Sequence, residues 1–330
     1  MWNTLASVGP GARAWNQVSY DGRPILAGGA TGGGRYSNDF WALESDVWRE
    51  IIPHVGTQEP TSREHHSFVH CPKDGKNYFW QGHGGTSANN WATPEMYRKI
   101  WRTNGEVWED TGALLPVSNG YKMSSGTEWC PPLDGFLTAG GGNLNWRGTY
   151  LLRHSDLQQV LLSTTGDPVG DPAYFMRFHV NNQMQWCDDI GRMALYGGQV
   201  DSGQGVTLDD LRLFHPGLLA WVDQPLINRP PSRSQAALVA TPGFLYVFGG
   251  SHRDVSGGII TRLGDLWKIN TDTWECEQLA DGPSEYFHGG VYHDGKLYFY
   301  GGFPSAKTYT YSLDPSVIIS LPSILTAEVQ

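Results

Sequence analysis

The chain has 330 residues, of which 42 are glycine and 20 are proline, and only 17% are charged. Glycine and proline destabilise the interior of a helix by about 1 and about 3 kcal/mol relative to alanine, so this composition argues against helical bundles and coiled coils and favours a turn-rich all-β protein. The formal net charge of −10 has the wrong sign for binding nucleic-acid phosphates, so we expect no nucleic-acid partner.

A short apolar run followed by glycines recurs along the chain. Six such runs are found: ILAGG at 25–29, YFWQGHGG at 78–85, FLTAGGG at 136–142, MALYGG at 193–198, LYVFGG at 245–250 and LYFYGG at 297–302. The last glycines counted in each run are 52 to 57 residues apart. A fixed period of this length is the signature of a repeat architecture.

Each unit contains the same parts in the same order. A strand and a tight turn precede the glycines, as at Asp21-Gly22, a dipeptide that suits a hairpin turn with positive φ. A variable loop and a third strand follow, for example residues 38–43, and then a fourth strand marked in four units by Trp48, Trp108, Trp221 and Trp274. Four antiparallel strands per unit make one propeller blade, so the pattern predicts a six-bladed β-propeller.

The whole chain, 1–330, is predicted to form one propeller domain. The expected blades span 12–55, 63–112, 120–165, 173–225, 233–281 and 286–321. Trp2 precedes Gly29 by nearly the same interval that separates a fourth-strand tryptophan from the next glycine pair, so residues 1–7 are expected to close the ring as the outer strand of the sixth blade. Residues 317–321 compete for that outer place.

The order of these parts resembles the kelch-repeat family, in which a double glycine after an apolar strand is joined to an aromatic residue later in the unit. The resemblance covers essentially the whole chain. Units three and six depart from it, with Val160 and Val317 near the tryptophan position, and unit two has a long insert between Gly85 and Trp108. The resemblance implies a kelch-type propeller fold. It implies little about function, because family members bind proteins, form scaffolds or, more rarely, catalyse reactions.

One face of the predicted propeller collects arginine and aromatic residues. The loops that lead into the innermost strands and the loops that follow the glycine pairs open on this same face, because an antiparallel second strand returns to the end where the first began. Arginine and aromatic side chains commonly anchor binding. The predicted ligand-binding residues are Arg13, Trp15, Arg35, Tyr36, Arg63, His65, Trp91, Tyr121, Trp146, Arg147, Tyr174, Arg177, Arg233, His252, Arg253, Tyr286 and His288. The alternative is that the arginines at the inner-strand starts brace one blade to the next.

These residues favour a non-catalytic binding or scaffold module whose partner is a protein, an acidic peptide or a glycan. Such a module also fits a component of a larger assembly, such as a viral or phage attachment structure. The kelch resemblance implies that this face serves as the site, as in kelch proteins that bind acidic peptides. The alternative is an enzyme that acts on a sugar or small molecule at the mouth of the central channel. In that case the candidate acids, bases or ligands are His65, His288, Tyr121, Tyr174 and Tyr286.

The remaining features point away from other classes of protein. Cys71, Cys130 and Cys187 end the inner strands of successive units, but such strands diverge and buried free cysteine is common, so we expect reduced thiols, no metal site and no cofactor. Residues 1–11 have neither a basic start nor an apolar core, and no run approaches the roughly 18 apolar residues of a membrane span. We expect a soluble, cytoplasmic or virion-associated protein without a classical signal peptide or membrane insertion.

Overall fold

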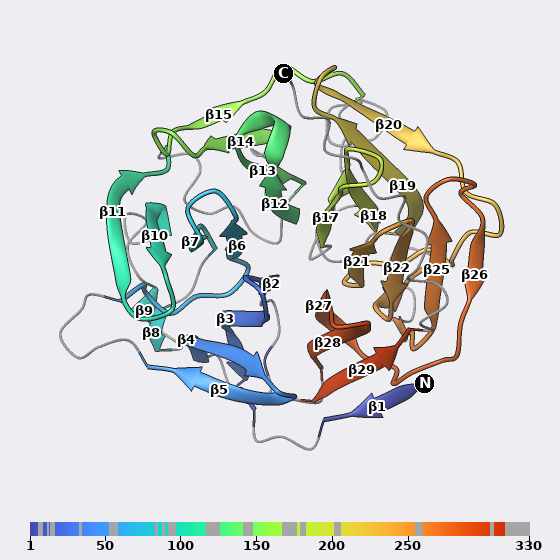
Figure 1. The fold of residues 1–330 in the computed structure, drawn as a ribbon, viewed down its shortest axis with the longest axis horizontal. Helices are drawn as coiled ribbons and strands as arrows, with labels where there is room; N and C mark the ends of the chain where they lie inside the picture. The colour runs from blue at the N-terminus through green and yellow to red at the C-terminus, as the bar shows by residue number, and fades with distance from the viewer. Residues whose placement is uncertain are drawn as a thin grey trace, which may run out of the picture.

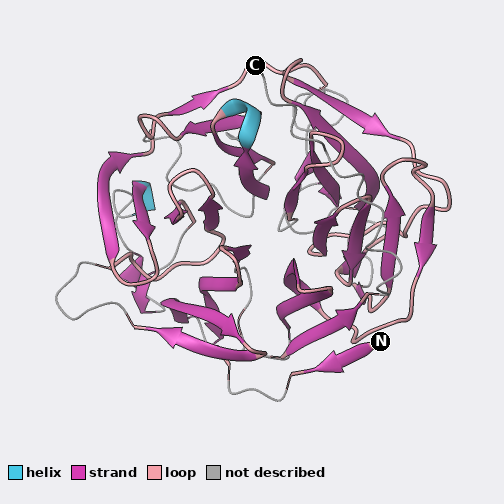
Figure 2. Cartoon of the chain, viewed as in Figure 1, coloured by secondary structure: helices cyan, strands magenta, loops and turns pink. Residues whose placement is uncertain are grey.

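Six antiparallel sheets surround a central axis in the computed structural model of the chain (Figure 1). The structure describes residues 1–5, 9–11, 13, 17–32, 35–52, 59–82, 85–87, 90–91, 97–116, 126–140, 148–166, 177–178, 183–200, 206–254, 260–303 and 307–313. Strands and loops make up almost all of it (Figure 2). The predicted all-β, six-bladed β-propeller is confirmed.

Every blade has four strands, which we number from the channel outward, and blades 1 to 6 follow the chain. The innermost strands are β2 (Gln17–Tyr20), β6 (Ser67–Cys71), β12 (Gly126–Cys130), β17 (Met184–Cys187), β21 (Ala237–Thr241) and β27 (Tyr286–His293). The second strands are β3 (Pro24–Gly32), β7 (Lys76–Trp80), β13 (Gly135–Ala139), β18 (Arg192–Val200), β22 (Phe244–Phe248) and β28 (Lys296–Phe303). The third strands are β4 (Arg35–Glu44), β10 (Lys99–Thr103), β14 (Tyr150–Arg153), β19 (Thr207–His215), β25 (Leu266–Asn270) and β29 (Thr308–Ser312). The outer strands are β5 (Val47–Ile51), β11 (Trp108–Leu114), β15 (Gln159–Leu161), β20 (Ala220–Gln224), β26 (Cys276–Gln278) and β1 (Trp2–Thr4).

A few short elements lie outside this four-strand scheme. Strand β16 (Arg177–Phe178) extends blade 4 by pairing with β18. Two small hairpins pair β8 (Gly85–Ser87) with β9 (Asn90–Trp91) and β23 (Ser251–His252) with β24 (Thr261–Arg262). A 3-10 turn, η2 (Pro131–Leu133), joins β12 to β13. In the described part of the chain no helix has the length and apolar character needed to cross a membrane.

The N-terminal strand closes the ring by pairing with the last blade. Strand β1 pairs antiparallel with β29, with Trp2 opposite Tyr311 and Thr4 opposite Tyr309. The innermost strands contact one another in sequence, and β27 contacts β2. The N-terminal strand is therefore the outer strand of blade 6, as predicted (Figure 1). The competing segment, 317–321, lies outside the described residues.

The hydrophobic core is divided among the interfaces between blades. Each of the six clusters of buried apolar residues draws on two neighbouring blades. Between blades 1 and 2, for example, Phe40 packs edge-on against Phe68 with ring centroids 5.6 Å apart. The faces of a radial sheet are thus both covered by neighbouring blades, which is why the second strands are apolar almost throughout.

Positive φ angles occur at the glycine pairs of the second strands or directly after these strands, as the glycine pattern predicts. Gly28 and Gly29 have φ of 65° and 106°, and a Cβ at Gly28 would lie 3.1 Å from the carbonyl oxygen of Arg63 in the next blade. In blade 2 the equivalent positions are Gln81 and Gly82, with φ of 50° and 89°. The pair ending at residue 85 is therefore not the structural counterpart. Backbone geometry, rather than the double glycine, is what repeats in that blade.

Two outer-strand tryptophans link their blade to the one before it. The indole of Trp48 donates a hydrogen bond to Thr308 Oγ1 at 2.6 Å, and the indole of Trp221 donates one to Thr149 Oγ1 at 2.7 Å. Both tryptophans lie in outer strands, as predicted. Trp274 differs, because it lies just before β26 with a φ of 59°.

All four cysteines are free, buried thiols. Burial raises the pKa of Cys71 to about 11 and that of Cys130 to about 12. These thiols are therefore protonated at neutral pH.

Candidate functional site

The predicted arginine face contains guanidinium groups that are engaged inside the protein. Arg13 is 4% exposed and donates to both carboxylate oxygens of Asp39, at 2.6 and 2.8 Å, and to the carbonyl oxygen of Gly28 at 2.9 Å. Burial opposes ionisation of Asp39, but hydrogen bonds from Arg13, Ser37 and Trp41 outweigh it and lower the pKa of the carboxyl group. Arg13 joins the start of its own inner strand to the second and third strands of the blade.

Blade 5 repeats this arrangement. Arg233 is fully buried and donates to the two oxygens of Asp265 at 2.8 and 2.7 Å and to the carbonyl oxygen of Gly249 at 3.0 Å. The indole of Trp267 completes the set by donating to Asp265 Oδ2 at 2.6 Å. Because Gly198 of blade 4 also donates its backbone N–H to the Arg233 carbonyl at 2.8 Å, the residue links two blades. The guanidinium contacts of Arg13 and Arg233 thus brace strands within one blade, whereas the alternative expected these arginines to brace one blade to the next.

Arg63 occupies the same position in blade 2, where the third strand carries Lys99 in place of the aspartate. The guanidinium is fully buried between the rings of Phe79 and Tyr97, with its central carbon 5.0 and 5.4 Å from their centroids. It donates to the carbonyl oxygen of Gln81 at 3.1 Å. Burial lowers its pKa to about 9.

The other predicted face residues are only partly described. Tyr36, His65, His252 and Arg253 are half-buried on this face. His65 Nε2 lies 3.9 Å from Glu64 Oε1, and His252 Nδ1 lies 2.9 Å from Ser232 Oγ. The backbones of Arg35, Trp91, Arg177, Tyr286 and His288 lie in strands, but their side chains are outside the described part. Residues wholly outside the described part are Trp15, Tyr121, Trp146, Arg147 and Tyr174.

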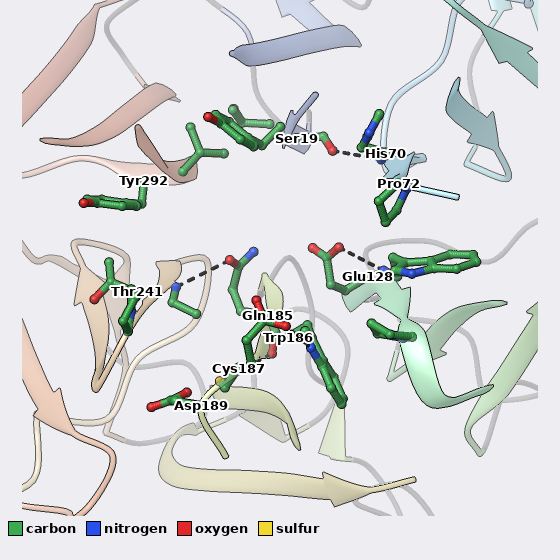
Figure 3. A pocket seen from close by; sticks show the side chains of 18 residues that line it. Ser19, His70, Pro72, Glu128, Gln185, Trp186, Cys187, Asp189, Thr241 and Tyr292 are labelled. Atoms are coloured by element: carbon green, nitrogen blue, oxygen red, sulfur yellow. Dashed lines mark hydrogen bonds between the residues drawn. The ribbon is translucent and has the colours of Figure 1, made fainter. Parts of the chain in front are cut away.

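A cavity of about 590 Å³ lies at the other mouth of the channel. All six inner strands contribute to it, at the ends where they turn into the second strands (Figure 3). We call this side of the propeller the turn face and the predicted side the loop face. The lining residues are Val18, Ser19, Tyr20, His70, Pro72, Glu128, Trp129, Pro131, Gln185, Trp186, Cys187, Asp188, Asp189, Ala240, Thr241, Pro242, Val291 and Tyr292.

The cavity combines aromatic rings with polar groups. Its rings come from four different blades and belong to Tyr20, Trp129, Trp186 and Tyr292. Its acidic groups are Glu128, Asp188 and Asp189. Pockets that bind small molecules have this size and this mixture of apolar walls with a few placed polar groups.

Glu128 and Gln185 extend toward the middle of the cavity (Figure 3). Glu128 Oε1 accepts a hydrogen bond from the backbone N–H of Trp129 at 2.9 Å, and Gln185 Oε1 lies 3.5 Å from the backbone nitrogen of Ala240. Burial raises the pKa of Glu128 to about 7, against the effect of the Trp129 hydrogen bond. Glu128 therefore changes charge near neutral pH, a property common among groups in functional sites.

Gln183 links three blades across the channel, close to the cavity. Its side chain is buried and crosses the channel from blade 4, where Nε2 donates to the carbonyl oxygen of Gly290 at 3.0 Å and Oε1 accepts from the Gly290 N–H at 2.8 Å. Nε2 also lies 3.5 Å from the carbonyl oxygen of Val18 in blade 1. Since Val18 and Val291 line the cavity, this amide lies close to it.

The predicted site lies at the opposite mouth. Among the residues proposed for the enzyme alternative, the side chain of His65 is described and does not line the cavity, whereas the side chains of His288, Tyr121, Tyr174 and Tyr286 lie outside the described part. The sequence contains one indication of this cavity. Glu128 and Trp129 lie on an inner strand that is otherwise apolar or small, and Trp186 follows the same pattern in the next blade.

No protein-family model matches this chain. The resemblance to kelch-repeat proteins therefore stays a prediction from the glycine and aromatic pattern.

Proposed function

We propose that the chain is a non-catalytic binding module of the kelch type and that it binds a glycan through the turn-face cavity. The observation that carries this proposal is the convergence of aromatic rings and carboxyl and amide groups on one cavity. A sugar presents C–H faces that pack on aromatic rings and hydroxyl groups that donate to carboxylate and amide oxygens. The cavity volume suits the end of a glycan chain.

The charges in the cavity favour this ligand over an acidic peptide. Three carboxyl groups, those of Glu128, Asp188 and Asp189, line it together with a single histidine, His70. Like charges across an interface suppress binding. The buried arginines that suggested an acidic partner already hold Asp39 and Asp265. A neutral glycan therefore fits the cavity best. The loop face remains the proposed surface for a protein partner or a larger assembly.

A glycan-array screen followed by isothermal titration calorimetry tests the proposal. Trp186→Ala removes one ring of the cavity and Gln185→Ala removes one amide, so each should weaken the Kd at least tenfold. His252→Ala, on the loop face, is the matched control and should leave the Kd unchanged. Binding that survives both cavity substitutions, or that is lost in His252→Ala alone, would move the site to the loop face. A screen with no binding glycan contradicts the ligand class.

The raised pKa of Glu128 favours a second candidate, a hydrolase acting on a glycan in the same cavity. A carboxyl group that holds its proton near pH 7 can serve as a general acid toward a glycosidic oxygen. Incubating the protein with the bound glycans and analysing the products by mass spectrometry separates the two functions. Turnover that is lost in Glu128→Gln, with binding retained, supports the hydrolase. Unchanged glycans support the binding module.

A further inference from the structure

Cys71, Asp74 and His154 bring three different metal-binding groups together at the junction of blades 2 and 3. Cys71 ends β6, Asp74 lies in the turn that follows, and His154 follows β14 of the neighbouring blade. Their ligand atoms all lie within 4.8 Å of one another. An ion can therefore be placed within about 2.8 Å of all three atoms, so movements of about 0.5 to 0.8 Å produce the 2.0 to 2.3 Å bonds of zinc.

The neighbours of this group hold the ligands in place. Asp74 Oδ2 accepts a hydrogen bond from the Tyr78 hydroxyl at 2.8 Å, and Oδ1 accepts one from the Lys76 backbone N–H at 3.1 Å. The His154 ring meets the edges of Tyr78 and Trp129, with centroids 6.1 and 5.8 Å apart. Such second-layer contacts fix the orientation of metal ligands.

Charge around the group also suits a divalent cation. The nearest lysine of the turn, Lys73, is paired with Asp134 at 2.7 Å. The His154 Nε2 lies 3.3 Å from Asp74 Oδ2, so the imidazole already faces the carboxylate across the space an ion would take. Cys130 ends the inner strand of blade 3 as Cys71 does in blade 2, and within the described residues no comparable His or acidic group surrounds it.

We propose that Cys71, Asp74 and His154 bind one zinc ion, with a water molecule as the fourth ligand. A thiolate, an imidazole and a carboxylate are the ligands zinc prefers, and Asp74, the most exposed of the three, leaves room for solvent. On binding, the Cys71 thiol releases its proton to water and the imidazole coordinates in its neutral form through Nε2. The ion would then cross-link the inner strand of blade 2 to the third strand of blade 3, beside the cavity that His70, Pro72 and Trp129 line.

Zinc binds cysteine as the thiolate, so the Cys71 thiol must lose its proton when the ion binds. A bound cation supplies the positive charge that stabilises the thiolate. Zinc should accordingly bind more weakly as pH falls.

Titration of the reduced, chelator-treated protein with Co²⁺ tests this site. One equivalent should give the absorption of a thiolate-to-cobalt bond together with the visible bands of a tetrahedral ion, and zinc should displace it. Cys71→Ser should abolish the thiolate absorption, and His154→Gln and Asp74→Asn should each weaken binding at least tenfold. Cys130→Ser is the control and should titrate like the natural sequence.

A protein that shows no thiolate absorption with Co²⁺ contradicts the proposal without any variant. So does absorption that persists in Cys71→Ser or disappears in Cys130→Ser. Should a variant fold poorly, the thermal midpoint of the unaltered protein gives a second readout: one equivalent of zinc should raise it, whereas magnesium, which avoids thiolates, should not.

Discussion

The guanidinium of Arg233, which is fully buried, donates two parallel hydrogen bonds to the carboxylate of Asp265, at 2.8 and 2.7 Å. The same pairing joins Arg13 to Asp39 four blades away along the chain. In both blades the aspartate also accepts a hydrogen bond from the indole of the tryptophan two residues further along the chain. The arginine, the aspartate and the tryptophan thus form a repeated internal brace.

Removing the arginine of this brace should destabilise the fold. Arg233→Ala leaves the carboxylate of Asp265 buried without its cation, so we expect the free energy of unfolding to fall by about 3–5 kcal/mol. Urea denaturation measures it. Arg229→Ala is the control, since this exposed residue pairs with Asp209 at the surface and should change stability by about 1 kcal/mol or less. Equal stability of the two variants would show that the brace contributes nothing.

Glu128 should make stability depend on pH. Its folded-state pKa of about 7 lies above the ordinary value of 4.5, so the unfolded chain loses this proton at lower pH than the folded one. Stability from this group is therefore full below about pH 4.5, falls as pH rises, and is lost above about pH 7. Thermal unfolding of Glu128→Gln should show a larger gain over the natural sequence at pH 8 than at pH 5.

The difference between the two proteins isolates Glu128, because His70, Asp188 and Asp189 share the cavity and are present in both. A gain that is the same at pH 5 and pH 8 would mean that Glu128 is ionised throughout this range.

Gln183 should stabilise the fold through its hydrogen bonds across the channel. Gln183→Ala removes its two hydrogen bonds to Gly290 and leaves that buried backbone group without this partner, so we expect a loss of about 1–3 kcal/mol in unfolding free energy. Gln185→Ala is the matched control, because its amide makes one long contact with the Ala240 nitrogen, at 3.5 Å, and one local hydrogen bond to the carbonyl oxygen of the preceding residue, Met184, at 3.2 Å. Chemical denaturation that ranks the two variants in the opposite order would contradict the role of Gln183.

Trp2 should secure the closing strand. Its ring lies 4.7 Å from that of Phe248 and 5.2 Å from that of Tyr311, and its indole donates to the Ala280 carbonyl at 2.7 Å. Trp2→Ala should therefore lower the unfolding free energy by about 2 kcal/mol or more, given its partial burial. Calorimetric unfolding measures it, and Asn3→Ala, which alters an exposed side chain of the same strand, should shift the midpoint little. A stable Trp2→Ala protein would show that backbone pairing alone closes the ring.

Much of the fold could be predicted from the sequence because the repeat carries it. The apolar second strands, the outer tryptophans Trp48, Trp108 and Trp221, and the spacing of Trp2 each mark a fixed place in a blade. Blade 2 shows where the prediction from double glycines fails. Gln81 adopts positive φ without being glycine, so a count of double glycines misses the position.

The site was harder to predict because residue type does not reveal burial. An exposed arginine at the start of an inner strand is well suited to binding a ligand. Arg13 and Arg233 instead each donate hydrogen bonds to an aspartate more than 20 residues away in the chain. The cavity combines residues from six strands, so Glu128 and Gln185 acquire a shared role only when the ring is closed. The grouping of Cys71 with His154, 83 residues apart, likewise depends on two blades meeting.

The pairing of β1 with β29 also constrains biosynthesis. Tyr311 is synthesised 309 residues after its partner Trp2, so at about 5–20 residues per second strand β1 waits roughly 15 to 60 seconds for its place. During that interval an aromatic strand edge is exposed in the growing chain, and five blades can assemble before the sixth is complete. This ring closure therefore requires that Trp2 be protected in the nascent chain, either by a chaperone or by transient packing on blade 5.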